Sequence, residues 1–475
     1  MKSFILILTL LSFPALSQQI YQVNEVEKVA EPSGGIAFLN QFITANIQIP
    51  IKLAAKGVNA RVFVKGVVEP DGSMSGLAIL RSLNKESDAE AIRLLTLYRA
   101  WKPGLVKEKP VRQAVVFPVI FRTNPMPEYD STENSFIEYL DKDNLLTRDA
   151  KKYKFRNVIP VDERGFVRDD ILYEELRLGK WKTVVKIPFE KKEIWATVSG
   201  SADVDSVKAF RISAKMNNYE SSYEEMIIQP DGKLLAHSTY PGSGRPPSSG
   251  KFYFLSGMLK EDQTNVDSLV KITDWFDNGQ IHSIVEIGNG KGTIIKNVWN
   301  RDGKQIVTNG NGWGQIKGIS YDRKKIFEEG KVENGSKSGR WTSKLADSTL
   351  IYEEFYENGK LVKGINQDKT EYTNDDNKPA EFKGGKSKLY PFLGANIHYP
   401  YEASLHKITG KVIVSFIILE DGTLTDYKFE KSVEKSLDEE ALRVVKKSSG
   451  MWEPGMMRGK KIQERYSLPI NFAIE

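Results

Sequence analysis

"GKVIVSFIILEDGTLTDYKFEKS", residues 410–432, decides the fold of the last part of the chain. Apolar side chains fill nearly every position from Val412 to Leu419, which is typical of a largely buried β-strand. Asp421-Gly422 predicts a tight turn, because glycine tolerates the positive φ that hairpin turns require. A second strand is expected over roughly residues 425–432. The stretch therefore predicts a β-hairpin whose first strand lies in a core.

A helix and a final strand follow this hairpin. Ser436 and Glu439 have the spacing of a capping box, and Gly450 predicts the end of the helix. Apolar and polar side chains then alternate from Tyr466 to Phe472, which predicts a last strand. Residues 381–475 are therefore expected to form a β-β-α-β domain after an irregular or helical lead-in.

Several short motifs occur in this domain in a fixed order. They are Tyr-Pro-x-x-Ala (Tyr399, Pro400, Ala403), Gly410, Asp-Gly (Asp421, Gly422), Asp-x-x-Ala (Asp438, Ala441), Trp-x-Pro-Gly (Trp452, Pro454, Gly455) and Pro-Ile-x-Phe (Pro469, Ile470, Phe472). Together they resemble the C-terminal domain of TonB, which belongs to the energy transducers of Gram-negative envelopes. The resemblance implies a domain that binds protein partners in the cell envelope.

The same pattern occurs earlier in the chain, at residues 31–123. Pairs of identical residues lie 350 positions apart (Pro50 and Pro400, Asp71 and Asp421, Ser82 and Ser432, Asp88 and Asp438), and Trp101 and Trp452 lie 351 apart. A repeat at this distance indicates a duplicated domain. The first copy departs from the pattern, because Ile49 replaces the tyrosine of the Tyr-Pro motif and Lys65-Gly66 is expected to interrupt its first strand. Its partner binding is therefore in question.

The resemblance also implies where a partner binds. In the TonB family, an extended segment of an outer-membrane receptor pairs beside the last strand, near the Tyr-Pro motif. Carried over to this chain, that implicates His398, Tyr399, Pro400, Gln463, Arg465, Ser467, Pro469 and Asn471.

Proline in each final strand supports an exposed sheet edge. Pro118 and Pro469 cannot donate to a β-ladder, so their strands are expected at an edge. An edge can receive a strand from another protein. The alternative is that Pro469 protects the edge against pairing.

The centre of the chain differs in character. Asn-Gly and Asp-Gly turns between short aromatic runs predict successive hairpins over residues 166–364, and these segments resemble bacterial variants of MORN repeats. Residues 124–165 are expected to be a connector with a short helix from Phe136 to Leu146, and the polar residues 365–380 a linker. The predicted fold class is therefore α+β, with two TonB-C-like β-β-α-β domains flanking a mostly β, MORN-like hairpin-repeat region.

The N-terminus has the features of a secretory signal peptide over residues 1–17. Lys2 precedes a ten-residue apolar core, Phe4–Phe13, which is too short to span a bilayer, and Ala15 and Ser17 are suited to cleavage before Gln18. An uncleaved membrane anchor is the alternative. Cleavage would leave no stable membrane anchor and would place the protein in the periplasm.

The composition excludes several classes of function. The formal net charge of +6 on 475 residues is spread without dense Lys/Arg runs, so no nucleic-acid partner is expected. The absence of cysteine excludes disulfides, thiol catalysis and a lipid-modified N-terminal cysteine.

No catalytic or cofactor motif emerges. The four histidines, His237, His282, His398 and His406, lack zinc-ligand spacing. The stretch Gly244–Lys251 has the wrong glycine spacing for a phosphate loop, and Gly288–Gly292 lacks the third glycine of a dinucleotide site. We therefore expect no enzyme, no cofactor and no metal.

Two functions remain. One is a periplasmic TonB-like protein that binds a TonB-dependent receptor or another envelope protein in energy-transducing transport across the outer membrane. The other is a scaffolding protein of the envelope with no transport role. The sequence leaves the oligomeric state open.

The first testable prediction concerns the N-terminus. We expect the mature protein to begin near Gln18 and to be released without detergent, because the apolar core is short and the cleavage residues are small. N-terminal sequencing of the protein from fractionated cells checks this. Retention of Met1 in a membrane fraction would instead indicate an anchor.

Overall fold

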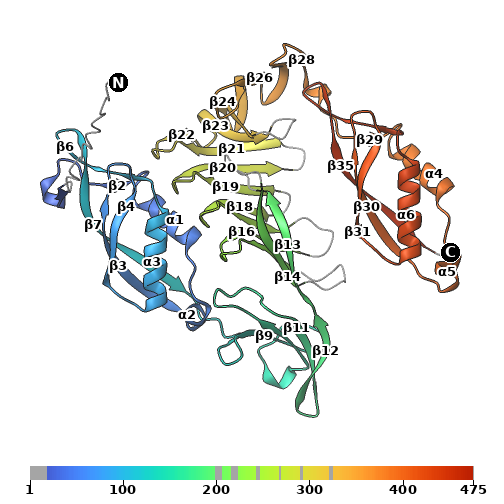
Figure 1. Cartoon of the computed structure of the whole chain (residues 1–475), viewed down its shortest axis with the longest axis horizontal. Helices are drawn as coiled ribbons and strands as arrows, with labels where there is room; N and C mark the ends of the chain where they lie inside the picture. The colour runs from blue at the N-terminus through green and yellow to red at the C-terminus, as the bar shows by residue number, and fades with distance from the viewer. Residues whose placement is uncertain are drawn as a thin grey trace, which may run out of the picture. The chain divides into compact units, whose positions relative to one another are not determined.

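The computed structural model describes residues 19–197, 206–214, 223–241, 247–266, 269–288, 292–319 and 325–473. The predicted signal peptide lies outside these residues. The chain divides into two compact units, Met1–Thr308 and Asn309–Glu475, and strands predominate in both. Each unit contains one α+β domain and part of a long antiparallel meander (Figure 1).

The α+β domain of the second unit is built on a three-stranded sheet. Its elements are β29 (Glu381–Phe382), α4 (Lys386–Asn396), α5 (Tyr401–Leu405), β30 (Gly410–Ile418), β31 (Leu424–Lys431), α6 (Lys435–Lys447), β32 (Trp452–Glu453), β33 (Gly455–Met457), β34 (Lys460–Ile462) and β35 (Glu464–Phe472). The sheet order is β31-β30-β35. The central strand, β30, is the apolar strand that the sequence predicted to be buried. Helix α6 covers one face of this sheet (Figure 1).

The core lies between α6 and the sheet. Val412, Val414, Phe416 and Ile418 of β30 are fully buried, as is Leu437 of α6. Burial of side chains of this size stabilises a fold by roughly 1.5–3 kcal/mol each, so β30 is the main source of apolar contacts.

The start of α6 differs from the expected capping box. The helix begins at Lys435, and its N-cap is Glu434, whose carboxylate accepts a hydrogen bond from the Ser436 backbone N–H at 2.9 Å. The predicted box of Ser436 and Glu439 is therefore wrong. A carboxylate near a helix N-terminus satisfies the same free N–H groups and is favoured by the helix dipole.

The α+β domain of the first unit has the same order of helices and main sheet strands, preceded by a short strand and a 3₁₀ helix. Its elements are β1 (Ile20–Tyr21), η1 (Val23–Glu25), β2 (Glu31–Pro32), α1 (Ile36–Asn46), α2 (Ile51–Lys56), β3 (Val58–Val68), β4 (Met74–Arg81), α3 (Lys85–Leu97), β5 (Trp101–Lys102), β6 (Gly104–Val106) and β7 (Lys109–Thr123). Its sheet order is β1-β7-β3-β4, with β6 pairing to β7.

Internal hydrogen bonds repeat between the two domains. In the first, Arg93 pairs with Glu90 at 2.7 Å and donates to the carbonyl of Asn46 at 2.7 Å. In the second, Arg443 pairs with Glu440 at 2.7 Å and donates to the carbonyl of Asn396 at 2.6 Å. The two domains therefore share side-chain contacts as well as element order.

The first strand of the first copy is continuous. β3 runs from Val58 to Val68, and the register against β4 shifts between Lys65 and Val67. The same shift occurs in β30 between Ser415 and Ile417. Lys65-Gly66 therefore forms a β-bulge common to both copies, and the expected interruption is wrong.

The connector is also a sheet. Residues after the first domain form β8 (Tyr129–Asp130), β9 (Ser135–Leu140), η2 (Ala150–Lys152), β10 (Phe155–Pro160), β11 (Ile171–Arg177) and β12 (Lys180–Ile187), in the order β12-β11-β10-β9-β8. The helix predicted over Phe136–Leu146 is wrong, because Ser135–Leu140 pairs with β10.

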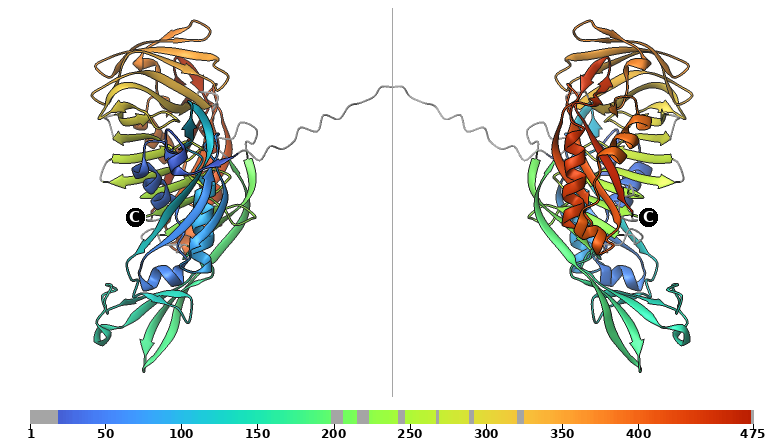
Figure 2. Two further views of the ribbon diagram at one scale, coloured as in Figure 1. Left: turned by 90° about the vertical axis from the view of Figure 1, so that its left-hand side faces the viewer. Right: turned by 90° about the vertical axis from the view of Figure 1, so that its right-hand side faces the viewer.

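The meander makes up most of the remaining chain. In the first unit it comprises β13 (Phe189–Thr197), β14 (Ser206–Ala214), β15 (Tyr223–Ile228), β16 (Leu234–Tyr240), β17 (Ser249–Tyr253), β18 (Leu259–Val266), β19 (Leu269–Trp275), β20 (Ile281–Gly288), β21 (Gly292–Trp299) and β22 (Gln305–Thr308). In the second unit it comprises β23 (Asn311–Ile319), β24 (Lys325–Glu333), β25 (Ser336–Lys344), β26 (Leu350–Glu357), β27 (Lys360–Asn366) and β28 (Glu371–Tyr372). Within each unit, strands of the meander that are neighbours in the chain pair with one another (Figure 2).

Four hairpin turns of the meander occur at Asn-Gly or Asp-Gly pairs that the sequence predicted. Gly279, Gly303, Gly335 and Gly359 have φ between +76° and +91° and each lies between two paired strands. The centre is therefore mostly β, as expected.

The segment expected to be a linker has regular structure. It contains β28 and the 3₁₀ helix η3 (Asn374–Asp376), and Tyr372 is buried. The segment is mostly polar, but the buried aromatic ring of Tyr372 fixes it in place.

Glycine at the first hairpin turn of the second copy gives a stability prediction. Gly422 has φ +83°, and a Cβ there would lie 2.2 Å from the carbonyl oxygen of Trp452. Gly450 has φ +82° with nothing within 4 Å of such a Cβ. We expect Gly422→Ala to destabilise the domain by about 2–4 kcal/mol and Gly450→Ala by about 1 kcal/mol, because only the first adds a backbone clash to the strained φ.

Urea unfolding of residues 374–475, followed by the fluorescence of Trp452, measures both variants. Equal losses of stability would show that the close approach to Trp452 costs nothing.

Candidate partner-binding edge

The outer edge of β35 is the first feature of the candidate site. β35 pairs antiparallel with β30 over its whole length, from Glu464 opposite Ile418 to Phe472 opposite Gly410. Among the residues that the structure describes, no strand pairs with its other side. A full row of backbone groups in β35 therefore lies at a sheet edge.

Side chains of β35 alternate strictly between the two faces of the sheet. Leu468, Ile470 and Phe472 are buried beneath the domain's helices, and the predicted residues Arg465, Ser467, Pro469 and Asn471 are exposed on the open face. Gln463 is also exposed and separates β34 from β35. The structure thus places four of these predicted residues on one strand and the fifth, Gln463, immediately before it.

Two of these residues are held by neighbours on the open face. Arg465 forms an ion pair with Asp426, and the hydroxyl of Ser467 donates to the Glu430 carboxylate at 2.8 Å. Arg465 and the ammonium group of Lys428 both lower the pKa of Asp426 below its ordinary value, Lys428 with the larger effect. The open face is therefore polar and charged beside the edge.

The Tyr-Pro motif lies at the end of β35. The ring of Tyr399 packs edge-on against Phe472, with centroids 5.7 Å apart, and its hydroxyl donates to the carbonyl of Ile408 at 2.5 Å. Pro400 is the N-cap of α5. Tyr399 is half-buried, so its main observable role is to fix the loop between α4 and α5 against the last strand.

His398 is exposed, and its backbone is tied to α6. Its N–H donates to the Glu440 carboxylate at 2.6 Å, and Arg443 pairs with the same group. Burial acts to raise the pKa of Glu440, but the hydrogen bonds from Arg443 and His398 outweigh it and hold that pKa below its ordinary value. The structure thus brings His398, Tyr399 and Pro400 together beside one end of the edge.

The first copy differs at the equivalent edge. Its last strand, β7, pairs in parallel with the chain's own β1, Ile20 opposite Arg112 and Tyr21 opposite Gln113. An open groove of about 910 Å³ lies between this N-terminal segment and the sheet. Ile20, Val23, Val29, Ile36 and Val116 line it and remain 43–60% exposed.

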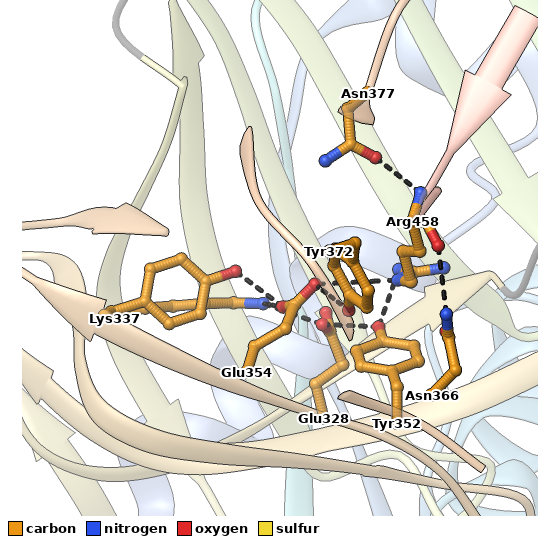
Figure 3. Close-up of polar contacts among 9 residues, drawn as sticks. Glu328, Lys337, Tyr352, Glu354, Asn366, Tyr372, Asn377 and Arg458 are labelled. Atoms are coloured by element: carbon orange, nitrogen blue, oxygen red, sulfur yellow. Dashed lines mark hydrogen bonds and ion pairs between the residues drawn. The ribbon is translucent and has the colours of Figure 1, made fainter. Parts of the chain in front are cut away.

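A second cluster, which the sequence did not predict, attaches the second copy to the meander. Arg458 lies in the turn between β33 and β34, and its guanidinium stacks 3.7 Å from the centroid of Tyr352 in β26. It donates to the Tyr352 hydroxyl at 2.7 Å and pairs with Glu354 at 3.6 Å (Figure 3). Only 14% of its side chain is exposed.

The cluster balances two acids with two bases. Lys337 pairs with Glu328 at 2.7 Å and lies 3.8 Å from Glu354 (Figure 3). Burial acts to raise the pKa of Glu328, but Lys337 and other neighbours outweigh it and lower that pKa. Burial also raises the pKa of Tyr352, whose hydroxyl donates to Glu328 at 2.7 Å. Each buried charge therefore has an opposite charge beside it, as buried charges require.

Backbone contacts hold the same turn. The amide of Asn366 donates to the carbonyl of Arg458 at 3.0 Å, and the backbone N–H of Arg458 donates to Asn377 at 2.8 Å (Figure 3). No sequence signal marks Arg458, because its charged partners lie about a hundred residues earlier in the chain and carry no motif.

The first copy contacts its part of the meander through other residues. The amide of Asn46, at the end of α1, accepts from the Leu259 backbone at 2.6 Å, and Phe38 packs edge-on against Trp299. The equivalent of Asn46 is Asn396, and both side chains donate to a carbonyl within their own helix, that of Phe42 or Phe392. The bond from Leu259 is thus an addition in the first copy.

These observations define two small α+β domains, each ending in a long strand; the outer edge of β35 is unpaired among the described residues, and that of β7 pairs in part with β1. Residues 45–123 and 395–474 each match the family described as Gram-negative bacterial TonB protein C-terminal. The chain therefore contains two copies of the TonB C-terminal domain, as the sequence predicted. No curated protein and no solved structure matches the chain.

Metal-binding groups and membrane-spanning helices are both absent from the part of the chain that the structure describes. No group of three or more His, Cys, Asp or Glu side chains there could hold a metal ion, and no helix there is long and apolar enough to cross a membrane. The matched family consists of non-enzymatic interaction domains, which agrees with the expectation that the protein is not an enzyme.

The Arg458 cluster gives the next prediction. We expect Arg458→Ala to weaken the attachment of the second copy to the meander by about 3–5 kcal/mol, because it leaves buried carboxylates short of a positive charge. Hydrogen exchange of β26, β27 and β28 measures the change. The matched control is Lys460→Ala, which removes the exposed pair with Asp368 (2.6 Å) and should cost at most about 1 kcal/mol. Similar exchange rates in the two variants would contradict the role of Arg458 in attaching the second copy to the meander.

Proposed function

We propose that the second TonB C-terminal domain, residues 381–475, binds an extended segment of an outer-membrane receptor or another envelope protein by strand addition at the outer edge of β35. The partner would contact the backbone of β35 and, at one end, the loop of His398, Tyr399 and Pro400. The observation that carries this proposal is the edge of β35, which no described strand occupies.

Pro469 indicates which backbone groups point outward. N–H groups of alternate residues in a strand point to the same side. Pro469 lies opposite Ile413 of β30 and has no backbone N–H. No hydrogen bond to β30 is lost if the backbone nitrogen at position 469 points away from β30. The N–H groups of Arg465, Ser467 and Asn471 then face the partner. A four- to six-residue strand would gain about 0.5–1.5 kcal/mol per hydrogen bond, offset by its ordering, so micromolar affinity is expected.

The wider role follows from the family. TonB C-terminal domains point to an envelope protein with a part in energy transduction. We propose that the protein acts in the periplasm after removal of residues 1–17, and that it supports transport across the outer membrane. We also propose that the central hairpins are MORN-like repeats.

A scaffolding role without transport is the second candidate. The Arg458 cluster favours it, because a domain fixed by buried charges to its own meander is suited to presenting an edge at a constant position. Capture of envelope proteins by residues 381–475 separates the two, since transport requires a receptor among them.

Ser467 provides the test of strand addition. We expect Ser467→Pro to weaken binding of receptor N-terminal peptides about three- to tenfold, because it removes one outward backbone donor. Ser467→Ala, which loses only the hydroxyl bonded to Glu430, should bind within about twofold of the unchanged domain.

Amide shifts of isotope-labelled residues 381–475 give both the affinity and the location. Shifts confined to residues 437–447 of α6, with residues 462–472 silent, would rule out this mode of binding. The same titration with Tyr399→Ala and Tyr399→Phe separates loss of the ring contact to Phe472 from loss of the hydrogen bond to Ile408.

A further inference from the structure

The segments that lead into the two TonB domains are equivalent to one another. Lys28 bridges to Leu105 in the first copy, and Lys378 bridges to Met456 in the second. A few residues earlier, each segment has a 3₁₀ helix, η1 or η3, and each of these follows a two-residue strand, β1 or β28. The duplication therefore extends upstream of the matched residues.

The two short strands pair with different partners. Tyr21 of β1 lies opposite Gln113 of β7, the last strand of its own domain. Its counterpart Tyr372 of β28 lies opposite Gly364 of β27, in the meander. The edge of β7 is thus partly covered by its lead-in strand, whereas the lead-in strand of the second copy lies elsewhere.

We propose that β1 is a built-in competitor that closes the strand-accepting edge of the first copy, and that capture of β28 by the meander leaves the equivalent edge of the second copy open. This closure involves β7 and its own lead-in strand. It does not depend on what binds β35.

Contacts of β1 are few, as an exchangeable strand requires. β1 pairs with two residues of β7, which runs from Lys109 to Thr123. The side chain of Ile20 remains 43% exposed at the rim of the apolar groove. A partner strand that ran parallel to β7, with a branched aliphatic residue in the place of Ile20, could replace both contacts and extend farther along the edge.

Contacts of β28 are many. Tyr372 is 2% exposed, and its hydroxyl donates to Glu354 at 2.8 Å. Its ring packs flat on Gly364, where a Cβ would lie 2.1 Å from the ring. Arg458 and Lys337 both pair with the same glutamate. The cluster that attaches the second copy to the meander therefore also retains its lead-in strand.

Tethering makes a weak strand an effective competitor. A segment joined by a short linker acts at an effective concentration of about 1 mM. A free peptide of the same sequence with a Kd of about 50 μM would thus bind the intact chain about twentyfold more weakly than a chain whose own segment is disabled.

The test uses the chain's own segment as the probe. A fluorescent peptide of residues 19–27 (QIYQVNEVE) is titrated against residues 18–475 and against the same chain with Ile20→Gly and Tyr21→Gly. We expect binding to the double variant and at least tenfold weaker binding to the unchanged chain. A scrambled peptide should bind neither, and Val116→Asp added to the double variant should abolish binding by charging the groove.

Hydrogen exchange of residues 112–116 provides a second readout. We expect these amides to exchange at least tenfold faster in the double variant and to be protected again by the peptide, while the buried residues Val62 and Val119 stay protected. Loss of protection at Val62 and Val119 would show that the double variant unfolds the domain. The single variant Tyr21→Pro is then used in its place.

Equal peptide affinity for the closed and opened chains would overturn the proposal, as would a folded variant that does not bind the peptide. Ser467→Pro, which acts on β35, should change neither result. Failure here is therefore distinguishable from failure of strand addition at β35.

Discussion

Burial of the Arg458 guanidinium is the interaction on which the arrangement of the second unit depends. Its ring contact with Tyr352 and its ion pair with Glu354 join a turn of the TonB domain to β26, and Glu354 also accepts a hydrogen bond from Tyr372 of β28. Such a contact is specific, because removing one member leaves the others charged and without water. An apolar contact of the same area would tolerate sliding, whereas this one fixes a single position.

Duplication followed by divergence explains the differences between the two copies. Contacts within each domain are retained, such as Arg93 with Glu90 and Arg443 with Glu440. Contacts to the meander are not: Asn46 and Asn396 share a bond within the helix, but Asn46 also accepts a hydrogen bond from Leu259. The two domains thus keep their fold but attach to the meander through different residues. Their last strands also differ, because β1 covers part of the edge of β7 and no described strand covers that of β35.

Local signals in the sequence predicted local structure well. The Asp-Gly and Asn-Gly turns and the alternation from Tyr466 to Phe472 depend on near neighbours, and the structure has hairpins and a strand at these places. Phe136 and Leu140 are four apart, a spacing that suits a helix, but Ser135–Leu140 pairs with β10, the next strand along the chain. The N-cap of α6 was also predicted wrongly. Glu434 and Ser436 can both accept a hydrogen bond from a backbone N–H, and because the helix begins at Lys435, Glu434 is the cap. The ion pair of Arg458 and the pairing of β1 with β7 both involve residues far away in sequence, so no local pattern could have predicted them.

Sequential pairing of the meander has a consequence for how such a chain varies. Each hairpin contacts only the ones before and after it, so its stability is close to a sum of nearest-neighbour couplings. A hairpin could then be gained or lost by in-register insertion or deletion, leaving its distant neighbours undisturbed. The hairpins that carry Glu328, Lys337, Tyr352 and Glu354 are the exception, because they hold a domain in place. Length variation among related chains should therefore concentrate in the strands that touch neither TonB domain.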